Sequence, residues 1–108
     1  MDTAMNQKER MLAGLPYKAW LDGLTEEREE NKKRIYRYNN TPPEQGEELG
    51  ALIREIIGKC GKNIFIEPPF RCDYGSNIEV GENFFANYNL TILDVGKVTI
   101  GKNAQIAP

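Results

Sequence analysis

The feature that most constrains this chain is an apolar residue at every sixth position in its second half. The first row of this repeat comprises Ile66, Cys72, Ile78, Phe84 and Leu90. A second row follows two positions behind the first and comprises Val80, Ala86 and Ile92. After Leu90 the register shifts by two positions, and the rows resume at Val98 and Ala104 and at Ile100 and Ile106. A period of six is neither helical nor a simple alternating strand, so it indicates a repeated structural unit.

This period is typical of a solenoid whose coil is a triangle, with one hexad on each of its three sides. The first residue of each hexad points inward, and glycines turn the corners where a Cβ atom would clash. The sequence therefore predicts a left-handed parallel β-helix over residues 62–108, in which each coil buries its apolar side against the next. The turn at Val80–Asn83 recurs at Ile100–Asn103, a spacing slightly longer than three hexads. We interpret the difference as a two-residue insertion that begins at Asp94.

The alternative is a small antiparallel sheet. Its turns would lie at Gly75, Gly81, Gly96 and Gly101, and residues 64–66 and 98–100 would be two of its strands. We favour the solenoid because a meander of antiparallel strands has no reason to keep a spacing of six over five consecutive positions.

Residues 7–61 have instead the pattern of a helical module, so the chain is an α+β protein with a helical first part. A short helix is expected over residues 7–13, before Gly14 and Pro16 end it. The run 25–33 has no apolar side chain and predicts a helix with a solvated surface.

A further helix is expected over residues 42–57. Thr41 would cap it, Pro42 would occupy its first position, and Glu44 would close a capping box. The apolar stripe of this helix comprises Leu49, Leu52, Ile53, Ile56 and Ile57. Such a stripe predicts packing against the rest of the domain.

Histidine is absent from this sequence, which excludes an imidazole base and any zinc site with histidine ligands within this chain. Cys60 and Cys72 are twelve positions apart with no second pair, so no metal site is expected. We expect both cysteines to be small buried apolar residues in a reducing compartment rather than catalytic thiols, since no activating base is visible.

The net charge is −2 and no basic stripe is present, which argues against a nucleic-acid partner. No apolar run is long enough to span a membrane, and the N-terminal segment does not have the pattern of a signal peptide. A cytoplasmic location is therefore the default expectation.

Several short segments run through both parts of the chain in a distinctive order. They are Met11–Gly14, Tyr36–Asn39, Glu67–Asn77, Gly81–Asn87, Leu90–Asp94, Val98–Gly101 and Ile106–Pro108. In this order they resemble the maltose and galactoside O-acetyltransferases of the hexapeptide-repeat superfamily. The resemblance covers nearly all of this chain but only about the first half of such an enzyme.

The resemblance implies a helical module packed on a left-handed β-helix, a homotrimer, and transfer of acetyl from acetyl-CoA (acetyl-coenzyme A) to a sugar hydroxyl. Acetyl-CoA would be a co-substrate, and no tightly bound cofactor is implied. In the family a histidine base follows shortly after the segment that matches Ala107–Pro108, and the coils that bind coenzyme A follow later. We therefore expect no acetyl transfer by this chain alone. The alternatives are a non-catalytic, truncated β-helix that serves as an assembly module and, less favoured, a sugar-binding module.

The resemblance also implies roles for Asn87 and Asp73, and residue type and position suggest roles for Phe85 and Asp94. Asn87 matches an asparagine that helps stabilise the tetrahedral intermediate, although an asparagine at a corner with positive φ is the alternative. Asp73 matches a polar residue that contacts the sugar, or is a turn residue. Phe85 would stack on a sugar ring or pack against another subunit. Asp94 is expected to project from the coil at the start of the insertion and to line the binding face, or to be a turn residue before Gly96.

Overall fold

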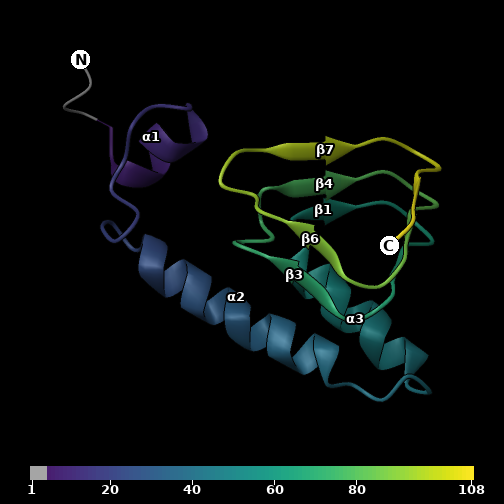
Figure 1. The fold of residues 1–108 in the computed structure, drawn as a ribbon. Helices are drawn as coiled ribbons and strands as arrows, with labels where there is room; N and C mark the ends of the chain where they lie inside the picture. Colours follow the sequence, from purple (N-terminus) through teal and green to yellow (C-terminus); the bar gives the residue numbers. More distant parts are fainter. Residues whose placement is uncertain (1–4) are drawn as a thin grey trace.

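The computed structural model describes residues 5–108 and shows three helices followed by eight short strands (Figure 1). The helices are α1 (Gln7–Leu12), α2 (Leu24–Asn39) and α3 (Gly46–Ile56). The strands are β1 (Lys59–Cys60), β2 (Phe65–Ile66), β3 (Phe70–Cys72), β4 (Ile78–Val80), β5 (Phe85–Ala86), β6 (Leu90–Ile92), β7 (Val98–Ile100) and β8 (Gln105–Ile106). All three helices precede the first strand, as the two patterns of the sequence predict.

The strands form three parallel sheets, in the orders β1-β4-β7, β2-β5-β8 and β3-β6. Consecutive strands of the chain belong to different sheets, so the chain winds around three sides and returns to the first. This arrangement is a parallel β-helix with a triangular coil, and the antiparallel alternative is wrong. The first strand, β1, begins at Lys59, slightly before the boundary that the sequence suggests.

Every coil of this solenoid is longer than the three hexads that the sequence predicts. Phe65 pairs with Phe85, and Phe85 pairs in turn with Gln105, and the other two sheets keep the same offset. The insertion predicted after Leu90 is therefore present, but the prediction of a single insertion is wrong, because the preceding coil has the same extension. The extra residues lie in the corner at residues 73–77 and recur in the equivalent corner at 93–97. Ile66 pairs with Ala86, which belongs to the second row of the repeat. The members of one six-residue row therefore do not stack directly on one another from coil to coil.

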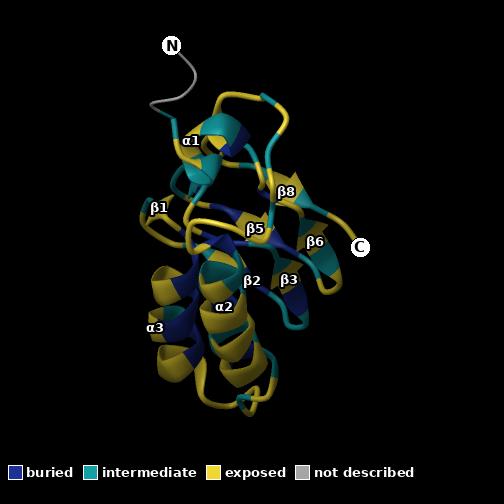
Figure 2. Cartoon of the chain, turned by 90° about the vertical axis from the view of Figure 1, so that its left-hand side faces the viewer, coloured by how far each residue is buried: buried dark blue, intermediate teal, exposed yellow. Residues whose placement is uncertain are grey.

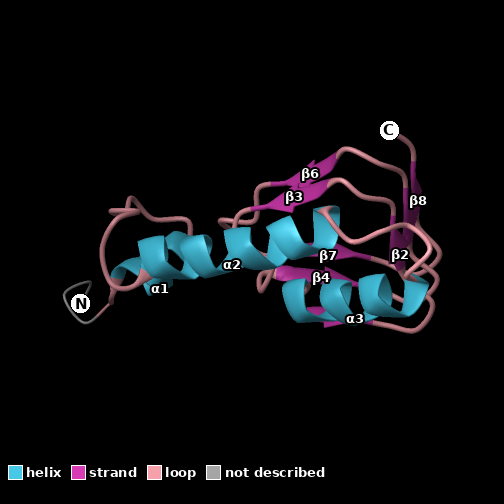
Figure 3. Cartoon of the chain, turned by 90° about the horizontal axis from the view of Figure 1, so that it is seen from below, coloured by secondary structure: helices cyan, strands magenta, loops and turns pink. Residues whose placement is uncertain are grey.

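The apolar row that the sequence predicts does point into one core. Ile66, Ile78 and Phe84 are buried there, and Cys72 and Leu90 are half-buried against the same cluster. The cluster continues into the helices through Tyr38 of α2 and the apolar stripe of α3, which comprises Leu49, Leu52, Ile53, Ile56 and Ile57. Figures 2 and 3 show α2 and α3 side by side next to the coils, and Figure 2 shows buried residues on α3. Helices α2 and α3 therefore share this core with the coils.

The start of α3 differs from its prediction. The helix begins at Gly46, and its N-cap residue Gln45 makes no capping hydrogen bond with its side chain. Thr41 instead donates its hydroxyl to the carbonyl oxygen of Arg37 at 2.6 Å. Because the last carbonyls of a helix lack partners within the helix, Thr41 closes α2 rather than opening α3.

The polar side chains of α2 satisfy the open backbone edge of the first coil. Asn39 donates its amide to the carbonyl oxygen of Phe70 at 3.0 Å and accepts the N–H of Phe70 at 2.9 Å. The hydroxyl of Tyr38 donates to the carbonyl oxygen of Ile66. The amide of Asn31 donates to the carbonyl oxygens of Cys72 and Asp73 at 3.3 and 3.1 Å. Burial, together with the nearby charge of Glu67, raises the pKa of Tyr38, so this hydroxyl keeps its proton and remains a donor.

One corner of the triangle carries a ladder of asparagine side chains. Asn63, Asn83 and Asn103 each have a positive φ, of 59°, 59° and 60°. The amide of Asn63 donates to the side-chain oxygen of Asn83 at 3.1 Å, and the amide of Asn83 donates to that of Asn103 at 3.0 Å. Asparagine tolerates the left-handed backbone region that this corner requires.

Replacing Asn39 with alanine should lower the free energy of unfolding by about 1–3 kcal/mol, because a donor and an acceptor of Phe70 lose their partner. The matched control is Asn40→Ala, since Asn40 is exposed and bonds only within α2 in the described chain. We expect that control to cost about 0.5 kcal/mol. Urea unfolding measures both, and equal losses would contradict the edge-capping role.

Candidate functional site

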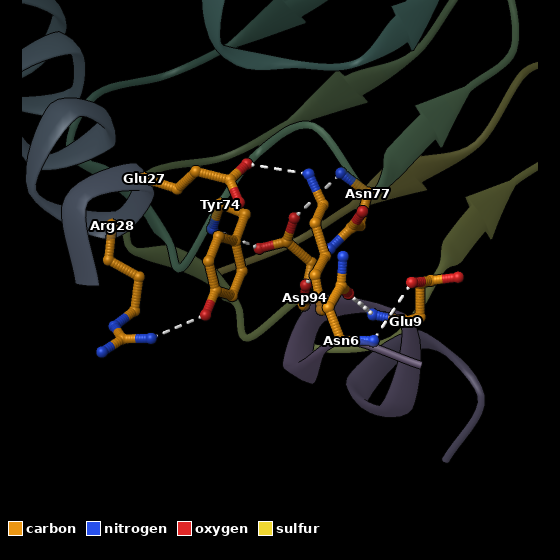
Figure 4. Close-up of polar contacts among 8 residues, drawn as sticks. Asn6, Glu9, Glu27, Arg28, Tyr74, Asn77 and Asp94 are labelled. Atoms are coloured by element: carbon orange, nitrogen blue, oxygen red, sulfur yellow. Dashed lines mark hydrogen bonds and ion pairs between the residues drawn. The ribbon is translucent and has the colours of Figure 1, made fainter. Parts of the chain in front are cut away.

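The corner at residues 73–77 is organised by the carboxylate of Asp94 in the next coil. Asp94 is fully buried, and its two oxygens accept the N–H of Tyr74 at 2.9 Å and that of Asn77 at 3.2 Å. The side-chain amide of Asn77 donates back to the carbonyl oxygen of Asp94 at 2.8 Å (Figure 4). The expectation that Asp94 projects from the coil is wrong, because the extension is present in both coils and the two extended corners bind each other. Asp94 lies buried in the corner that joins β6 to β7.

The same corner is held from outside by the first two helices. The guanidinium of Arg28 donates to the hydroxyl of Tyr74 at 2.7 Å, and Lys8 of α1 forms an ion pair with Glu27 of α2 at 3.0 Å (Figure 4). Tyr74 is buried in a second apolar cluster with Met11 and Leu24, against which Tyr17 packs. These contacts fix the backbone that carries Asp73.

Gly75 in this corner permits a close approach that no other residue would allow. Its φ is +76°, and a Cβ atom there would lie 2.2 Å from the carbonyl oxygen of Ile56. The end of α3 therefore rests directly on the corner, and Gly58 donates its N–H to the carbonyl oxygen of Gly75 at 3.0 Å.

Asp73 is half-buried beside a cleft of about 500 Å³ between α2 and the outer side of β3 and β6. Burial raises the pKa of its carboxyl, the nearby charge of Asp94 raises it further, and Arg28 lowers it. The cleft is also lined by Lys32, Ile35, Tyr36, Asn39, Asn40, Arg71, Cys72, Thr91 and Leu93. A volume of this size lies within the range of small-molecule sites.

Asn87 follows β5 and is half-buried. Its side-chain oxygen accepts the N–H of Tyr88 at 2.9 Å, so the NH₂ group is the donor end of this side chain. Asn87 does not have a positive φ, whereas Asn83, Asn89 and Asn103 do. The alternative in which Asn87 serves as a left-handed corner is therefore wrong, and the neighbouring asparagines occupy those corners.

Phe85 lies on the outer face of β5 and is partly exposed. Its ring stacks on that of Phe65 in the neighbouring coil, with ring centroids 5.9 Å apart. The two rings form an aromatic surface on the outside of the sheet β2-β5-β8. Such a surface suits either a sugar ring or another protein surface.

Within this chain, Asp73 and Asn87 are not neighbours. Asn87 lies before the beginning of β6, whereas Asp73 follows the end of β3, and these two strands are paired in parallel. The two side chains thus belong to opposite ends of one side of the triangle. A site that uses both residues on one small ligand needs a second copy of the chain or an extended ligand.

The cysteines are half-buried rather than fully buried, and both are free. Burial raises the pKa of the Cys72 thiol to about 12, so this thiol stays protonated near neutral pH. Cys60 accepts a hydrogen bond from Arg54 at 3.2 Å. Among the residues that the structure describes, no group of three or more metal-binding side chains gathers.

Sequence reasoning missed Tyr36, Arg71 and Thr91, which line the cleft. The correct coil length would have identified two of them, since it pairs Arg71 with Thr91 on the outer side of β3 and β6. Tyr36 lies just beyond the polar run 25–33, in a segment of the family resemblance, but no local pattern marks its side chain as part of a cleft.

The chain matches known proteins along most of its length. A family described as the maltose acetyltransferase hexapeptide capping motif matches residues 10–61. The galactoside O-acetyltransferase of Escherichia coli is 43% identical over 104 residues, which cover 96% of this chain and 51% of that protein. The chain thus spans about half the length of the curated relatives it matches.

Solved structures agree with these matches. A maltose O-acetyltransferase from Clostridium difficile superposes with a TM-score of 0.95 at 48% identity, over 97% of this chain and 56% of that chain. A galactoside acetyltransferase in complex with coenzyme A superposes with a TM-score of 0.86 at 38% identity, over 95% of this chain and 55% of that chain. In residues 5–108 no helix has the length and apolar character that crossing a membrane requires.

Replacing Asp94 with asparagine should lower the free energy of unfolding by about 2 kcal/mol, because a charged acceptor of two backbone N–H groups is lost. The matched control is Asp73→Asn, a carboxylate at the same corner that is only half-buried. Thermal or urea unfolding compares the two. A larger loss for Asp73→Asn would show that Asp94 does not hold the corner.

The stability of the protein should also depend on pH through Asp73. Its pKa is raised in the folded state, so the unfolded chain loses this proton first as the pH rises above the ordinary value of 3.8. The contribution of Asp73 to stability therefore falls between that pH and the raised pKa. Urea unfolding measures this contribution as the difference in unfolding free energy between the natural protein and Asp73→Asn, and this difference should shift against the natural protein from pH 3.8 to neutrality. A contribution that rises with pH would contradict the raised pKa.

Proposed function

We propose that this protein transfers acetyl from acetyl-CoA to a sugar hydroxyl. The premise is that the chain belongs to the maltose and galactoside O-acetyltransferase family of hexapeptide-repeat proteins. In this reaction the acetyl carbon leaves the thioester sulfur and bonds to the sugar oxygen, and the hydroxyl proton ends on the coenzyme A thiol. The chain contains no histidine. In this proposal the base that takes the hydroxyl proton therefore comes from outside this sequence.

The single observation that carries the proposal, within a chain of this family, is the orientation of the Asn87 amide. Its oxygen is engaged by the N–H of Tyr88 at 2.9 Å, so the NH₂ group is held as a preorganised donor. When the hydroxyl attacks the thioester, negative charge develops on the carbonyl oxygen. A neutral donor directed at that oxygen stabilises the transition state more than the ground state.

Asp73 supplies the complementary group for the acceptor in this proposal. A carboxylate accepts hydrogen bonds from two hydroxyls at once, which suits adjacent hydroxyls on a sugar ring. Its position in the cleft beside α2 leaves it accessible to a ligand. Asp94 has no such role here, because both of its oxygens bind the backbone of the corner.

A homotrimer is part of the same proposal. Asp73 and Asn87 lie at opposite ends of one side of the triangle, so a neighbouring copy would bring one residue of each kind together. The exposed pair Phe65 and Phe85 offers an aromatic surface for such a contact or for the sugar. We further propose a cytoplasmic location and a division into a helical module and left-handed coils. The boundary expected between residues 61 and 62 then moves to just before β1, which begins at Lys59.

Replacing Asn87 with alanine should lower kcat for acetyl transfer by about 10²-fold or more, with little change in KM for the sugar, because the donor acts in the transition state. The assay follows coenzyme A release by purified protein, at the full length of its natural reading frame, with maltose and a galactoside as acceptors. The control is Gln105→Ala, an exposed amide on β8. An unchanged kcat in Asn87→Ala, or no acetylation of either acceptor, would refute the proposal.

A further inference from the structure

We propose that the cleft between α2 and the outer side of β3 and β6 is a sugar subsite for an extended acceptor, so that the protein prefers an oligosaccharide to a monosaccharide. This inference rests on the proposed function, since it names the class of acceptor. The observation behind it is that a helix and a two-stranded sheet bring a ring, a carboxylate, a guanidinium and a hydroxyl to one cleft.

The floor of the cleft carries both kinds of hydrogen-bonding group that a sugar needs. The parallel register sets Arg71 beside Thr91, and both side chains are exposed on the outer side of the sheet. Asp73 continues the same row beyond the end of β3. A sugar hydroxyl donates and accepts, so a guanidinium, a hydroxyl and a carboxylate in one row can satisfy several of them.

The wall of the cleft supplies an apolar surface for the face of a sugar ring. Tyr36 projects from α2 with 69% of its surface exposed, and Leu93 of the corner extension is 68% exposed. The carbonyl oxygen of Tyr36 accepts the amide of Asn40 at 2.9 Å, which orders the end of the helix that carries the ring. A tyrosine ring presents a large apolar face at little conformational cost.

The charges in the cleft favour a neutral ligand. Lys32 is already paired with Glu29 at 3.2 Å. The other charged residues that line the cleft are Arg71 and Asp73, one of each sign. The amide of Asn39 is taken up by the backbone of Phe70, so it forms part of the wall rather than a recognition group. A phosphorylated or acidic sugar would bring a negative charge against Asp73.

The first experiment titrates the purified protein with glucose, maltose and maltotriose by calorimetry. We expect maltose and maltotriose to bind about tenfold more tightly than glucose, the order that one aromatic contact supplies. Tyr36→Ala should abolish this gain, Tyr36→Phe should retain it, and Arg71→Ala should reduce it. Trp20→Ala, which removes an equally exposed ring outside the cleft, is the matched control and should bind like the natural protein.

Equal affinities for the three sugars, an affinity gain that survives Tyr36→Ala, or no binding of any of them would overturn the subsite. A second readout separates this inference from the proposed function. If acetyl transfer proceeds with equal KM values for glucose and maltotriose and Tyr36→Ala changes neither, the subsite fails and the transferase stands. If no sugar is acetylated while the length-dependent affinity and its loss in Tyr36→Ala persist, the subsite stands and the transferase fails.

Discussion

The first coil of the solenoid has an open backbone edge, and the need to cover this edge determines where the helices pack. A parallel coil pairs with the next coil on one side, but on the other side its N–H and C=O groups need partners, since unpaired polar groups destabilise a buried edge. Here α2 supplies these partners from side chains, through Asn31, Tyr38 and Asn39. The apolar end of the coil is covered by α3. The side chains of the helical module therefore supply the hydrogen-bond partners that the backbone of a preceding coil would supply.

The extended corner of the coils links this constraint to the candidate chemistry. Asp94 binds the backbone of the corner in the preceding coil, and Arg28 holds the ring of Tyr74 from the helical side. Asp73 sits between these two anchored parts, half-buried against α2. The cleft exists because α2 lies along the edge of β3, so the helix that satisfies the backbone also provides one wall of the site.

Much of the fold could be predicted from the spacing of apolar residues, because a solenoid core accepts only apolar side chains at its inward positions. The spacing of six identified the inward row and the parallel coils. It did not identify the coil length. The extended corner at residues 73–77 keeps Cys72 and Ile78 six positions apart, although residues that stack from coil to coil are further apart than three hexads. The roles of Asp94 and Thr41 depend on hydrogen-bond partners in the preceding coil and in the preceding helix. A local sequence pattern does not contain these partners. For Asn87, the sequence left a corner role open, and only the backbone conformation excluded it.

The asparagine ladder at Asn63, Asn83 and Asn103 has a consequence for how the coils align. Each amide donates in the same direction, from an earlier coil to a later one, so the dipoles of the side chains add along the solenoid axis. A slip that brought the preceding residue to this corner would place a lysine or a glutamate at the left-handed position and break the bonds on both sides. The ladder therefore stabilises the correct stacking register of the coils. A further coil with an asparagine at the same corner would extend it.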